Sequence, residues 1–581
     1  LNSTAEERRE AVADIERAFD ENVNYPDYAR KLHLIENCIY GVDIQPIAIQ
    51  ISKLRFFISL VIDQKRNNNP ADNFGIRPLP NLEAKFVAAN SLLGLKRTEA
   101  SLFDSEEIKQ KERQLKIAKH KIFSARRPTT KEKWRNEVVR LRKEIADLLL
   151  EKDCIGNEQA AQLAQWDMFD QNTFAPFFDP EWMFGIKEGF DILIANPPYI
   201  STKGVSTADK KLFEAEFGFS DDTYNLFFFK GFSLLCEGGC ITYITPKTFW
   251  TTQTKRNLRD LLLANTLNYV FDTANPFEAV MVDTCITSAV KNKPAAENLV
   301  RFMDGRKSLL QPERLTVAQS VYLNTQNSVI FKPSELNMRI YELYGEKVKA
   351  LYDKWWDKIK TSRDIEKNKR ELEEYRASLK PGDVALLGCL TEGGQGLATA
   401  NNGKYIAVRS TTKWAENIRV SRPKKLADFL ARTPKAITAE MRRYPSYIAF
   451  LQSLSEAEIA ELFDSLKEQY GRDIFGQGYL YKIVDDCEIA DVDSLTDDEK
   501  ENGIETTKPY YVPYDKGDKD GNRWYLETPF AIAWSKENVR FLKTNSGKKG
   551  EGMPVVRNPQ FYFREGFCWI DVNSTYLKAR I

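Results

Sequence analysis

The sequence has 581 residues, of which 42% are hydrophobic and 29% charged, and this composition excludes a disordered or fibrous chain. Its 84 Lys and Arg residues balance 83 Asp and Glu residues, so nucleic-acid binding would require a local basic patch. No uninterrupted apolar run reaches the ~18 residues of a membrane helix, and the scattered Cys and His residues form no metal-ligand spacing. We therefore predict a cytoplasmic protein of about two to four domains, without a membrane segment, disulfide framework or bound metal.

The first part of the sequence, up to about residue 320, alternates short β-branched runs with longer helical patterns. This alternation is typical of a parallel sheet whose strands are joined by crossover helices. We therefore predict a Rossmann-like α/β domain over residues 1–325, with a doubly wound, mostly parallel sheet. The predicted strands lie at residues 38–43, 85–89, 190–195, 240–245, 268–272 and 283–290, and the main predicted helices at residues 46–63, 222–236 and 254–265.

A helical insertion is predicted within this domain at about residues 101–160. Lys, Arg and Glu are dense there, and apolar residues recur every three or four positions, as in an amphipathic helical hairpin. Charge runs on helices are usually solvated faces, which favours a structural arm. An arm that grips DNA remains the alternative.

Two further segments follow the first domain. Residues 326–380 are rich in Lys, Arg and Glu at helical spacing, which predicts a helical connector. After Pro381-Gly382 the sequence changes to short strand patterns, aromatic residues and Gly-rich turns, with one helical pattern at about residues 455–470. We therefore predict a second, α+β domain over residues 381–581.

The tetrapeptide Asn196-Pro197-Pro198-Tyr199 directly follows the apolar strand predicted at residues 190–195. Methylating an exocyclic amine requires acceptors that polarise the amine, because its lone pair is delocalised into the ring. The Asn196 side-chain oxygen and the Pro197 carbonyl would be these acceptors, and the two prolines stiffen the loop that presents them. Tyr199 would stack on the base. Open α/β sheets bind ligands at the carboxyl ends of their strands, which favours a functional loop over a rigid structural turn.

Five further segments carry the same resemblance to a known family as the tetrapeptide. They lie at residues 39–46, 85–93, 224–227, 238–250 and 277–286. Residues 191–291 resemble the amino-methyltransferase family of restriction–modification systems, in particular the large adenine-specific methylases of type IIG restriction enzymes and of BREX-type phage defence. The resemblance implies transfer of a methyl group from S-adenosylmethionine to N6 of adenine in a specific sequence of double-stranded DNA. Such enzymes flip the target base out of the duplex. Protein and RNA amine methyltransferases share this loop type, so the tetrapeptide alone leaves the substrate open.

The resemblance also implies a cofactor site at two strand ends. Asp43, followed by Ile44, would accept hydrogen bonds from the ribose hydroxyls of the cofactor, as an acidic residue does in dinucleotide-binding folds. Asn90, followed by Ser91, would read the amino group of its adenine. The family's Gly-rich cofactor loop is not found in the sequence, so we expect the chain to begin just after that loop.

For five other residues the resemblance implies a place near the pocket but no individual role. We expect Asp221, Asp222, Tyr224 and Phe227 near the rim of the base pocket, and Phe277 is a weak candidate for a second aromatic wall.

The far end of the sequence resembles the DNA target-recognition part of the same enzymes, at residues 391–399 and 562–569. Two alternatives remain: a bifunctional restriction endonuclease whose nuclease domain lies outside this chain, and a non-catalytic DNA-binding component of a defence system. In either case a nuclease domain or other defence-system subunits would be partners. Glu83-Ala84-Lys85 has the bare form of a nuclease motif but no Asp partner, so we predict no metal site.

Overall fold

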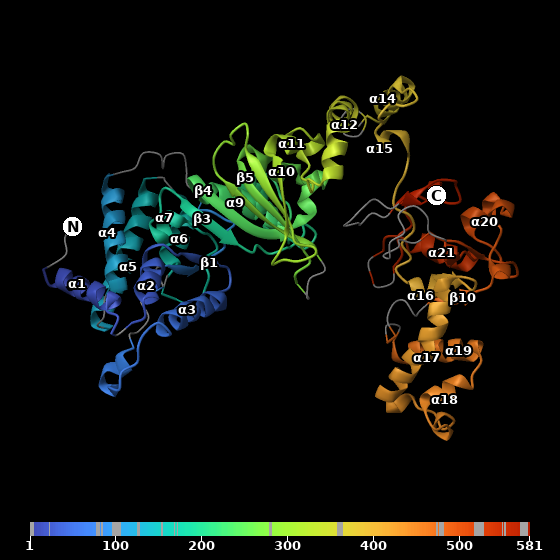
Figure 1. Cartoon of the computed structure of the whole chain (residues 1–581), viewed down its shortest axis with the longest axis horizontal. Helices are drawn as coiled ribbons and strands as arrows, with labels where there is room; N and C mark the ends of the chain where they lie inside the picture. Colours follow the sequence, from blue (N-terminus) through green and yellow to red (C-terminus); the bar gives the residue numbers. More distant parts are fainter. Residues whose placement is uncertain are drawn as a thin grey trace. The chain divides into compact units, whose positions relative to one another are not determined.

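The protein is described here by a computed structural model, shown in Figure 1, whose residues form two compact units, Leu1–Leu386 and Leu387–Ile581. The division into a catalytic domain, a connector and a recognition domain stays a prediction. The structure describes residues 5–580 except 23, 77–81, 83–84, 96–105, 125–127, 153–154, 168, 171, 278–281, 357–358, 360–363, 472–473, 476–480, 516–527, 549, 551–552 and 570–578.

A six-stranded mixed sheet forms the centre of the first unit. Its strands lie in the order β3 (Phe190–Ala195), β4 (Leu235–Pro246), β6 (Thr284–Val290), β5 (Thr266–Ala274), β7 (Leu299–Asp304) and β8 (Glu313–Ala318).

The α/β fold is confirmed, but the predicted doubly wound, mostly parallel arrangement is not. Strands β3, β4, β5 and β7 run in one direction, whereas β6 and β8 run in the other, so three of the five neighbouring pairs are antiparallel. The physical reason lies in the connection from β5 to β6, residues 275–283, which is too short to hold a crossover helix. The carboxyl ends of β3, β4, β5 and β7 consequently share one edge of the sheet.

A separate parallel pair, β1 (Gly41–Asp43) and β2 (Phe86–Ala88), precedes this sheet in the chain. The helix α3 (Pro46–Val61) connects the two strands. The ring of Tyr40, the residue before β1, lies 6.1 Å from the ring of Phe190, the first residue of β3. Strands β1 and β3 therefore begin side by side.

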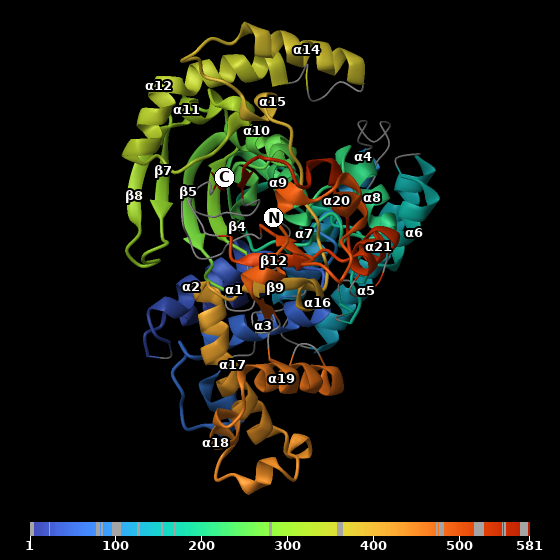
Figure 2. The same cartoon turned by 90° about the vertical axis from the view of Figure 1, so that its right-hand side faces the viewer.

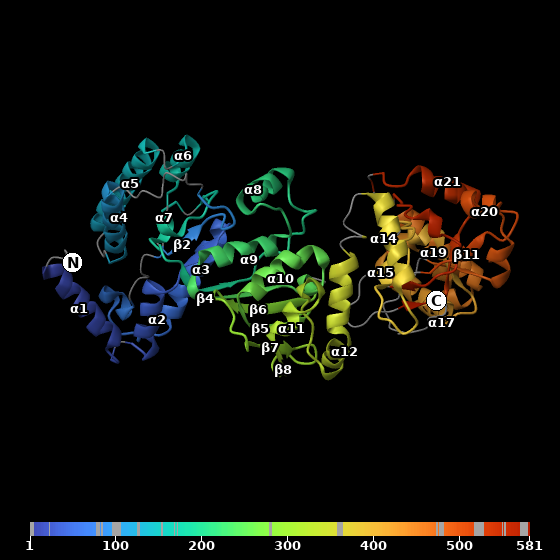
Figure 3. The same ribbon diagram turned by 90° about the horizontal axis from the view of Figure 1, so that it is seen from above.

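The main core lies on one face of the six-stranded sheet, under α9 (Thr223–Leu234) and α10 (Arg256–Ala264), which Figure 3 shows next to each other. Apolar side chains of α9 and α10 pack there against alternate residues of β4 and β5. The opposite face of β3 is not covered in this way, since its side chains Ile192 and Ile194 are 65% and 78% exposed. The fully buried side chains of the core include Phe228, Ile241, Phe249, Leu258, Leu262 and Val270.

The helical pattern between β2 and β3 corresponds to α4 (Glu106–Ser124) and α5 (Pro128–Glu151), which pack against each other (Figure 1). Their apolar stripe is buried: Val138, Leu141 and Ile145 have no exposed surface. This stripe shares a cluster with Trp182 and Met183 of α7 (Pro180–Phe184). The remaining helices of the unit are α1 (Ala5–Phe19), α2 (Asp27–Asn37), α6 (Asn157–Gln165), α8 (Thr207–Phe217), α11 (Gln319–Leu323), α12 (Glu335–Leu351) and α14 (Ile365–Ser378).

The second unit contains a four-stranded sheet in the order β10 (Lys482–Val484), β9 (Ile406–Arg409), β12 (Phe530–Ala533) and β11 (Tyr511–Pro513). Beside it lie α17 (Lys413–Arg432) and α19 (Glu456–Tyr470), which Figure 2 shows in contact. The pattern at residues 455–470 predicted α19, whose first turn is closed by a capping box of Ser455 and Glu458. The further elements are α15 (Leu387–Leu390), α16 (Asn402–Tyr405), α18 (Tyr447–Gln452), α20 (Asp497–Asn502), α21 (Lys536–Thr544), β13 (Cys568–Trp569) and β14 (Ala579–Arg580).

None of the helices in the described part of the chain is long and apolar enough to cross a membrane.

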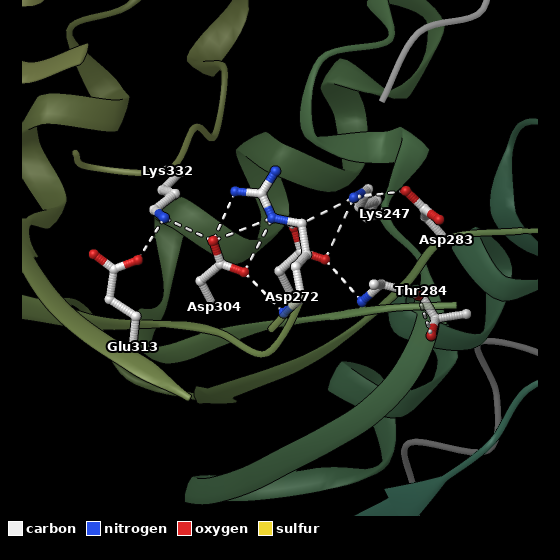
Figure 4. A network of polar contacts seen from close by, with 9 residues as sticks. Lys247, Asp272, Asp283, Thr284, Asp304, Glu313 and Lys332 are labelled. Atoms are coloured by element: carbon white, nitrogen blue, oxygen red, sulfur yellow. Dashed lines mark hydrogen bonds and ion pairs between the residues drawn. The ribbon is translucent and has the colours of Figure 1, made fainter. Parts of the chain in front are cut away.

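A polar network joins the carboxyl ends of β5 and β7 (Figure 4). Asp272 and Asp304 lie opposite each other in the two strands, and their side chains are only 6% and 7% exposed. Three cations neutralise these carboxylates. Lys247 lies 3.3 Å from Asp272, whereas Arg306 and Lys332 each donate to Asp304 over 2.7 Å.

The charge of Asp304 is therefore held by its neighbours. Burial alone would raise the pKa of this carboxyl, but the hydrogen bonds from Arg306 and Lys332 outweigh it and hold the pKa well below the usual range. A depressed pKa in the folded state stabilises the fold above the unfolded pKa of ~4, and this contribution is lost as the pH falls towards the folded pKa.

We predict that Asp304→Asn lowers the free energy of unfolding of the first unit by about 2 kcal/mol at pH 7, because Arg306 and Lys332 lose the buried negative charge that neutralises them. Urea unfolding measures the change. The matched control is Glu313→Gln, which removes a 55% exposed partner of the same Lys332 and is expected to cost under ~0.5 kcal/mol. The difference between wild type and Asp304→Asn is expected to shrink below about pH 4. Equal unfolding midpoints at pH 7 would contradict this account of the network.

Candidate functional site

The segment Asn196-Pro197-Pro198-Tyr199 leaves the sheet at the carboxyl end of β3. Pro197 is buried, Tyr199 is half-buried, and Asn196 and Pro198 are exposed. Because β3 is parallel to β4, the loop emerges beside the end of β4, where Ala195 pairs with Tyr243. The loop is therefore anchored by the buried Pro197, whereas the amide of Asn196 is exposed. An acceptor for an incoming ligand must be exposed in this way.

Tyr199 is anchored by both its ring and its hydroxyl. The ring packs against the core under α9. The hydroxyl lies 3.2 Å from the carbonyl oxygen of Ile244 in β4 and 3.1 Å from Oδ1 of Asn196, so its proton is shared between two acceptors. Burial raises the pKa of Tyr199, so the phenol stays protonated and can donate. This contact fixes the Asn196 amide with its oxygen towards the tyrosine; stacking of Tyr199 on a base stays a prediction.

The first residue of α9, Thr223, holds the exit of the loop. Its hydroxyl donates to the carbonyl of Pro198 and accepts the backbone N–H of Ile200 over 3.1 Å. Its own backbone N–H donates to the carbonyl of Ile200 over 3.0 Å. These hydrogen bonds join the loop to a helix that is packed into the core.

Asp222, which precedes α9, extends this clamp. Its carboxylate accepts the backbone N–H of Thr202 over 2.8 Å and the Thr202 hydroxyl over 3.0 Å. Lys255, whose side chain is 7% exposed, lies 2.8 Å from the other oxygen of Asp222 and also pairs with Asp221. Burial would raise the pKa of Asp222, but the hydrogen bonds from Lys255 and Thr202 together lower it. Asp222 is therefore a charged anchor for the chain beyond Tyr199.

The four residues expected near the pocket rim divide into two pairs. Asp222 contacts the loop segment through Thr202, and Asp221 is joined to Asp222 by Lys255. Tyr224 does not lie at a rim, since it is 2% exposed within the core, and Phe227 packs against the same core. The expectation for Tyr224 was wrong because the start of the helix turns this side chain inward, whereas Phe227 is half-buried and its place near the rim stays a prediction.

The residues predicted to hold the cofactor lie together at the ends of β1 and β2. Asp43 ends β1, and its backbone carbonyl accepts the N–H of Ala89 over 2.9 Å. Its exposed carboxylate accepts the N–H of Gln45 over 2.8 Å. Asn90 follows the neighbouring strand, and its Oδ1 accepts the N–H of Leu92 over 3.2 Å. Since the strands are parallel, both polar side chains stand at the same edge.

Two further side chains complete this edge. Ile44 beside Asp43 is 50% exposed, and Ser91 beside Asn90 is half-buried. An exposed carboxylate next to an exposed apolar side chain fits a ribose with its attached base. The chemistry of these residues therefore suits a nucleoside-containing cofactor.

Other sequence predictions are not brought to the site. Phe277 follows β5, and β4 and β6 separate that strand from β3 in the sheet. Glu83 and Ala84 of the nuclease-like tripeptide lie outside the described residues, and Lys85 donates to the Tyr40 hydroxyl over 2.8 Å. Within the described part of the chain there is no cluster of three or more His, Cys, Asp or Glu residues that would hold a metal.

Sequence reasoning missed Thr202, Thr223 and Lys255. A signal for Thr223 was present, because an Asp-Asp-Thr run before an apolar helical pattern is a typical helix start. For Lys255 there was no such signal, since its pairing with Asp221 and Asp222 exists only in the fold.

Comparison with known proteins bears on this site. A type II restriction enzyme and methyltransferase of Methanocaldococcus jannaschii, RM.MjaORFECS2P, is 26% identical over 331 residues, a match that takes in 47% of this chain and 27% of that protein. The chain thus spans about a quarter of the length of this relative. Among solved structures, the type IIG restriction endonuclease BpuSI matches 47% of this chain and 39% of its own, at 16% identity and a TM-score of 0.22. The M protein of the type I restriction enzyme EcoKI matches 48% of this chain and 47% of its own, at 14% identity and a TM-score of 0.20.

Residues 37–277 match the family model described as Eco57I restriction-modification methylase. This range contains β1 to β5, the loop at Asn196, the clamp at Asp222 and Lys255, and both cofactor-site strand ends. The segment that carries the Asn196 loop is therefore similar to restriction–modification methylases, the family that the motifs around Asn196 indicated.

Proposed function

We propose that this chain is the methyl-transfer and DNA-recognition part of an S-adenosylmethionine-dependent DNA adenine N6-methyltransferase of a restriction–modification or phage-defence system. The observation that carries the proposal is the Asn196 loop, held rigidly at the carboxyl end of β3 within the matched methylase segment. The alternatives are a bifunctional enzyme with a nuclease domain outside the chain and a non-catalytic DNA-binding component. The first is favoured by the name of the M. jannaschii relative, which combines a restriction enzyme and a methyltransferase.

The chain's own residues would bind and polarise the amine. Asn196 Oδ1 has two lone pairs, so it can accept an amine N–H while it keeps the hydrogen bond from Tyr199. The Pro197 carbonyl would accept the second N–H, and the neighbouring Pro198 carbonyl is already engaged by Thr223. Both acceptors pull electron density towards the nitrogen.

S-adenosylmethionine, held by Asp43, Ile44, Asn90 and Ser91 when bound, supplies the electrophilic methyl group. The Asn196 loop would hold the amine nitrogen towards this methyl group, and the proton released from the nitrogen would pass to water. The loop contributes mainly by orientation, because a donor and an acceptor of methyl must be aligned to react at a useful rate.

We predict that Asn196→Ala lowers kcat for methyl transfer to duplex DNA at least ~100-fold, because the loop loses one of its two acceptors. The measurement is transfer of labelled methyl from S-adenosylmethionine by the full-length gene product, with modified adenines mapped by sequencing. The DNA dissociation constant is expected to change less than about threefold. The control, Asn37→Ala, removes an exposed amide whose hydrogen bonds among the described residues go to His33. Undiminished methylation by Asn196→Ala would sink the proposal, and methylation of a base other than adenine would correct its specificity.

We predict that Thr223→Val lowers kcat about tenfold or more, while the KM for S-adenosylmethionine changes little. Valine keeps the shape of threonine but loses the hydroxyl that joins Pro198 to Ile200, so the loop is held less firmly. The expected stability loss is about 1 kcal/mol. Thr223→Ser should restore most of kcat because it restores the hydroxyl.

The matched control for this variant is Thr207→Val, at the exposed first residue of α8. A parallel fall of kcat in both valine variants would mean that the hydroxyl of Thr223 has no specific effect on the loop.

A further inference from the structure

Two distant segments of the second unit meet at a short stretch of backbone pairing. Ala398 exchanges two hydrogen bonds with Val555, over 3.0 and 2.9 Å. The Tyr514 hydroxyl also donates to the carbonyl of Leu397 over 2.9 Å. Residues 391–398 and 555–563 therefore form one surface, although more than 150 residues separate them in the sequence.

The apolar side chains of this surface point inward. Leu397 is 9% exposed in the core of the unit, and Val556, Tyr562 and Phe563 pack against that core. The ring of Phe563 lies 5.6 Å from the ring of Trp534. The two segments are thus packed against the core of the unit as well as paired with each other.

Polar side chains occupy the opposite, outer side. Gln395 and Arg557 are exposed, and Asn558 is half-buried. The Arg557 guanidinium donates to Oε1 of Gln395 over 2.5 Å, and the Asn558 amide donates to the backbone carbonyl of Gln395 over 2.9 Å. Gln395 is therefore held at both its side chain and its backbone.

Two glycines of the first segment differ in what the fold requires of them. A Cβ on Gly394 would collide with the amide of Asn558, so internal packing explains this glycine. A Cβ on Gly396 would meet nothing, and the backbone of Gly396 is not left-handed. The fold itself does not require Gly396. A glycine with open space before it allows a partner to approach the backbone closely.

The chemistry of this outer side fits the edges of DNA bases. Arginine donates two hydrogen bonds to O6 and N7 of guanine, and glutamine pairs with N6 and N7 of adenine. A neighbouring acceptor that orients the guanidinium reduces the entropy lost on binding. An exposed Arg–Gln pair on a fixed surface is therefore suited to direct readout, whereas a phosphate contact needs no such orientation.

We propose that Gln395 and Arg557 read adjacent base pairs in the major groove of double-stranded DNA, with Asn558 as the residue that positions Gln395. This inference rests on the proposed function, since it names the base-reading residues of that same enzyme. Arg557 contacts a guanine of the recognition sequence, and Gln395 contacts an adenine beside it.

The experiment is selection of duplexes from a random DNA pool by the full-length gene product, at fixed salt, for wild type and single variants. Arg557→Ala is expected to lose the preference for guanine at one position and to keep the other positions of the selected motif. Its affinity for the wild-type site should fall roughly tenfold to a hundredfold, while its affinity for unselected DNA changes less than about twofold. Arg557→Lys should not restore the guanine preference, because lysine lacks the two-pronged donor geometry.

A second variant and a control separate this role from a structural one. Gln395→Ala is expected to relax an A·T position next to that guanine. Arg564→Ala removes the same charge from another exposed arginine of the segment and should leave the motif unchanged. Thermal midpoints of all four variants are expected to stay within ~2 °C of wild type, since the replaced side chains are exposed.

Three results would overturn the proposal in distinguishable ways. An unchanged motif for Arg557→Ala would assign the pair a structural role. Uniform weakening on every sequence would assign Arg557 to the phosphate backbone. Failure of the wild-type protein to enrich any duplex would contradict the proposed function itself.

Discussion

The attachment of the Asn196 loop to the start of α9 is the constraint on which the site depends. A loop that leaves a sheet edge must satisfy its backbone polar groups, and here Thr223 and Asp222 bind the groups of Pro198, Ile200 and Thr202. Because α9 is packed against the sheet, the loop shares the rigidity of the core. Rigid acceptors lose no entropy when a ligand arrives, and this is what a site that must align an amine needs.

The sheet edge that carries the loop is also where buried carboxylates and cations alternate. Lys255 joins two aspartates beside α9, and Asp272 and Asp304 are each neutralised at the ends of β5 and β7. Each pairing offsets the cost of removing a charge from water, and the pairs made by Lys255, Lys247 and Lys332 join segments that lie apart in the sequence. Charges that are satisfied within the protein contribute little attraction to a distant polyanion. Recognition of DNA by this chain, whose net charge is only +1, would therefore depend on side chains that face outward.

Much of the fold could be predicted, because contiguous apolar runs mark buried strands. All six predicted strands are present, and the loop at Asn196 needed no tertiary information because its four residues are adjacent in sequence. What could not be predicted depends on contacts between distant residues. Burial alternates along β7, but its exposed Leu299 and its buried Asp304 conceal that alternation in the sequence, and β8 has little alternation at all. The helix α17 contains Pro423, which normally ends a helix. Burial of Ile418 and Leu426 on either side of that proline stabilises the helix despite the lost hydrogen bond.

The same difference between local and long-range information applies to the two candidate recognition residues, Asn196 and Arg557, and to the residues that orient them. Asn196 and Arg557 are each visible in the sequence as residue types with suitable chemistry, yet neither is oriented by its sequence neighbours alone. The amide of Asn196 is fixed by a tyrosine that is itself held by β4, and the guanidinium of Arg557 is fixed by Gln395, 162 residues away. A side chain with several rotatable bonds becomes selective only when its conformation is set before binding. The long-range contacts that no local pattern predicts are therefore the ones that would turn common residue types into specific sites.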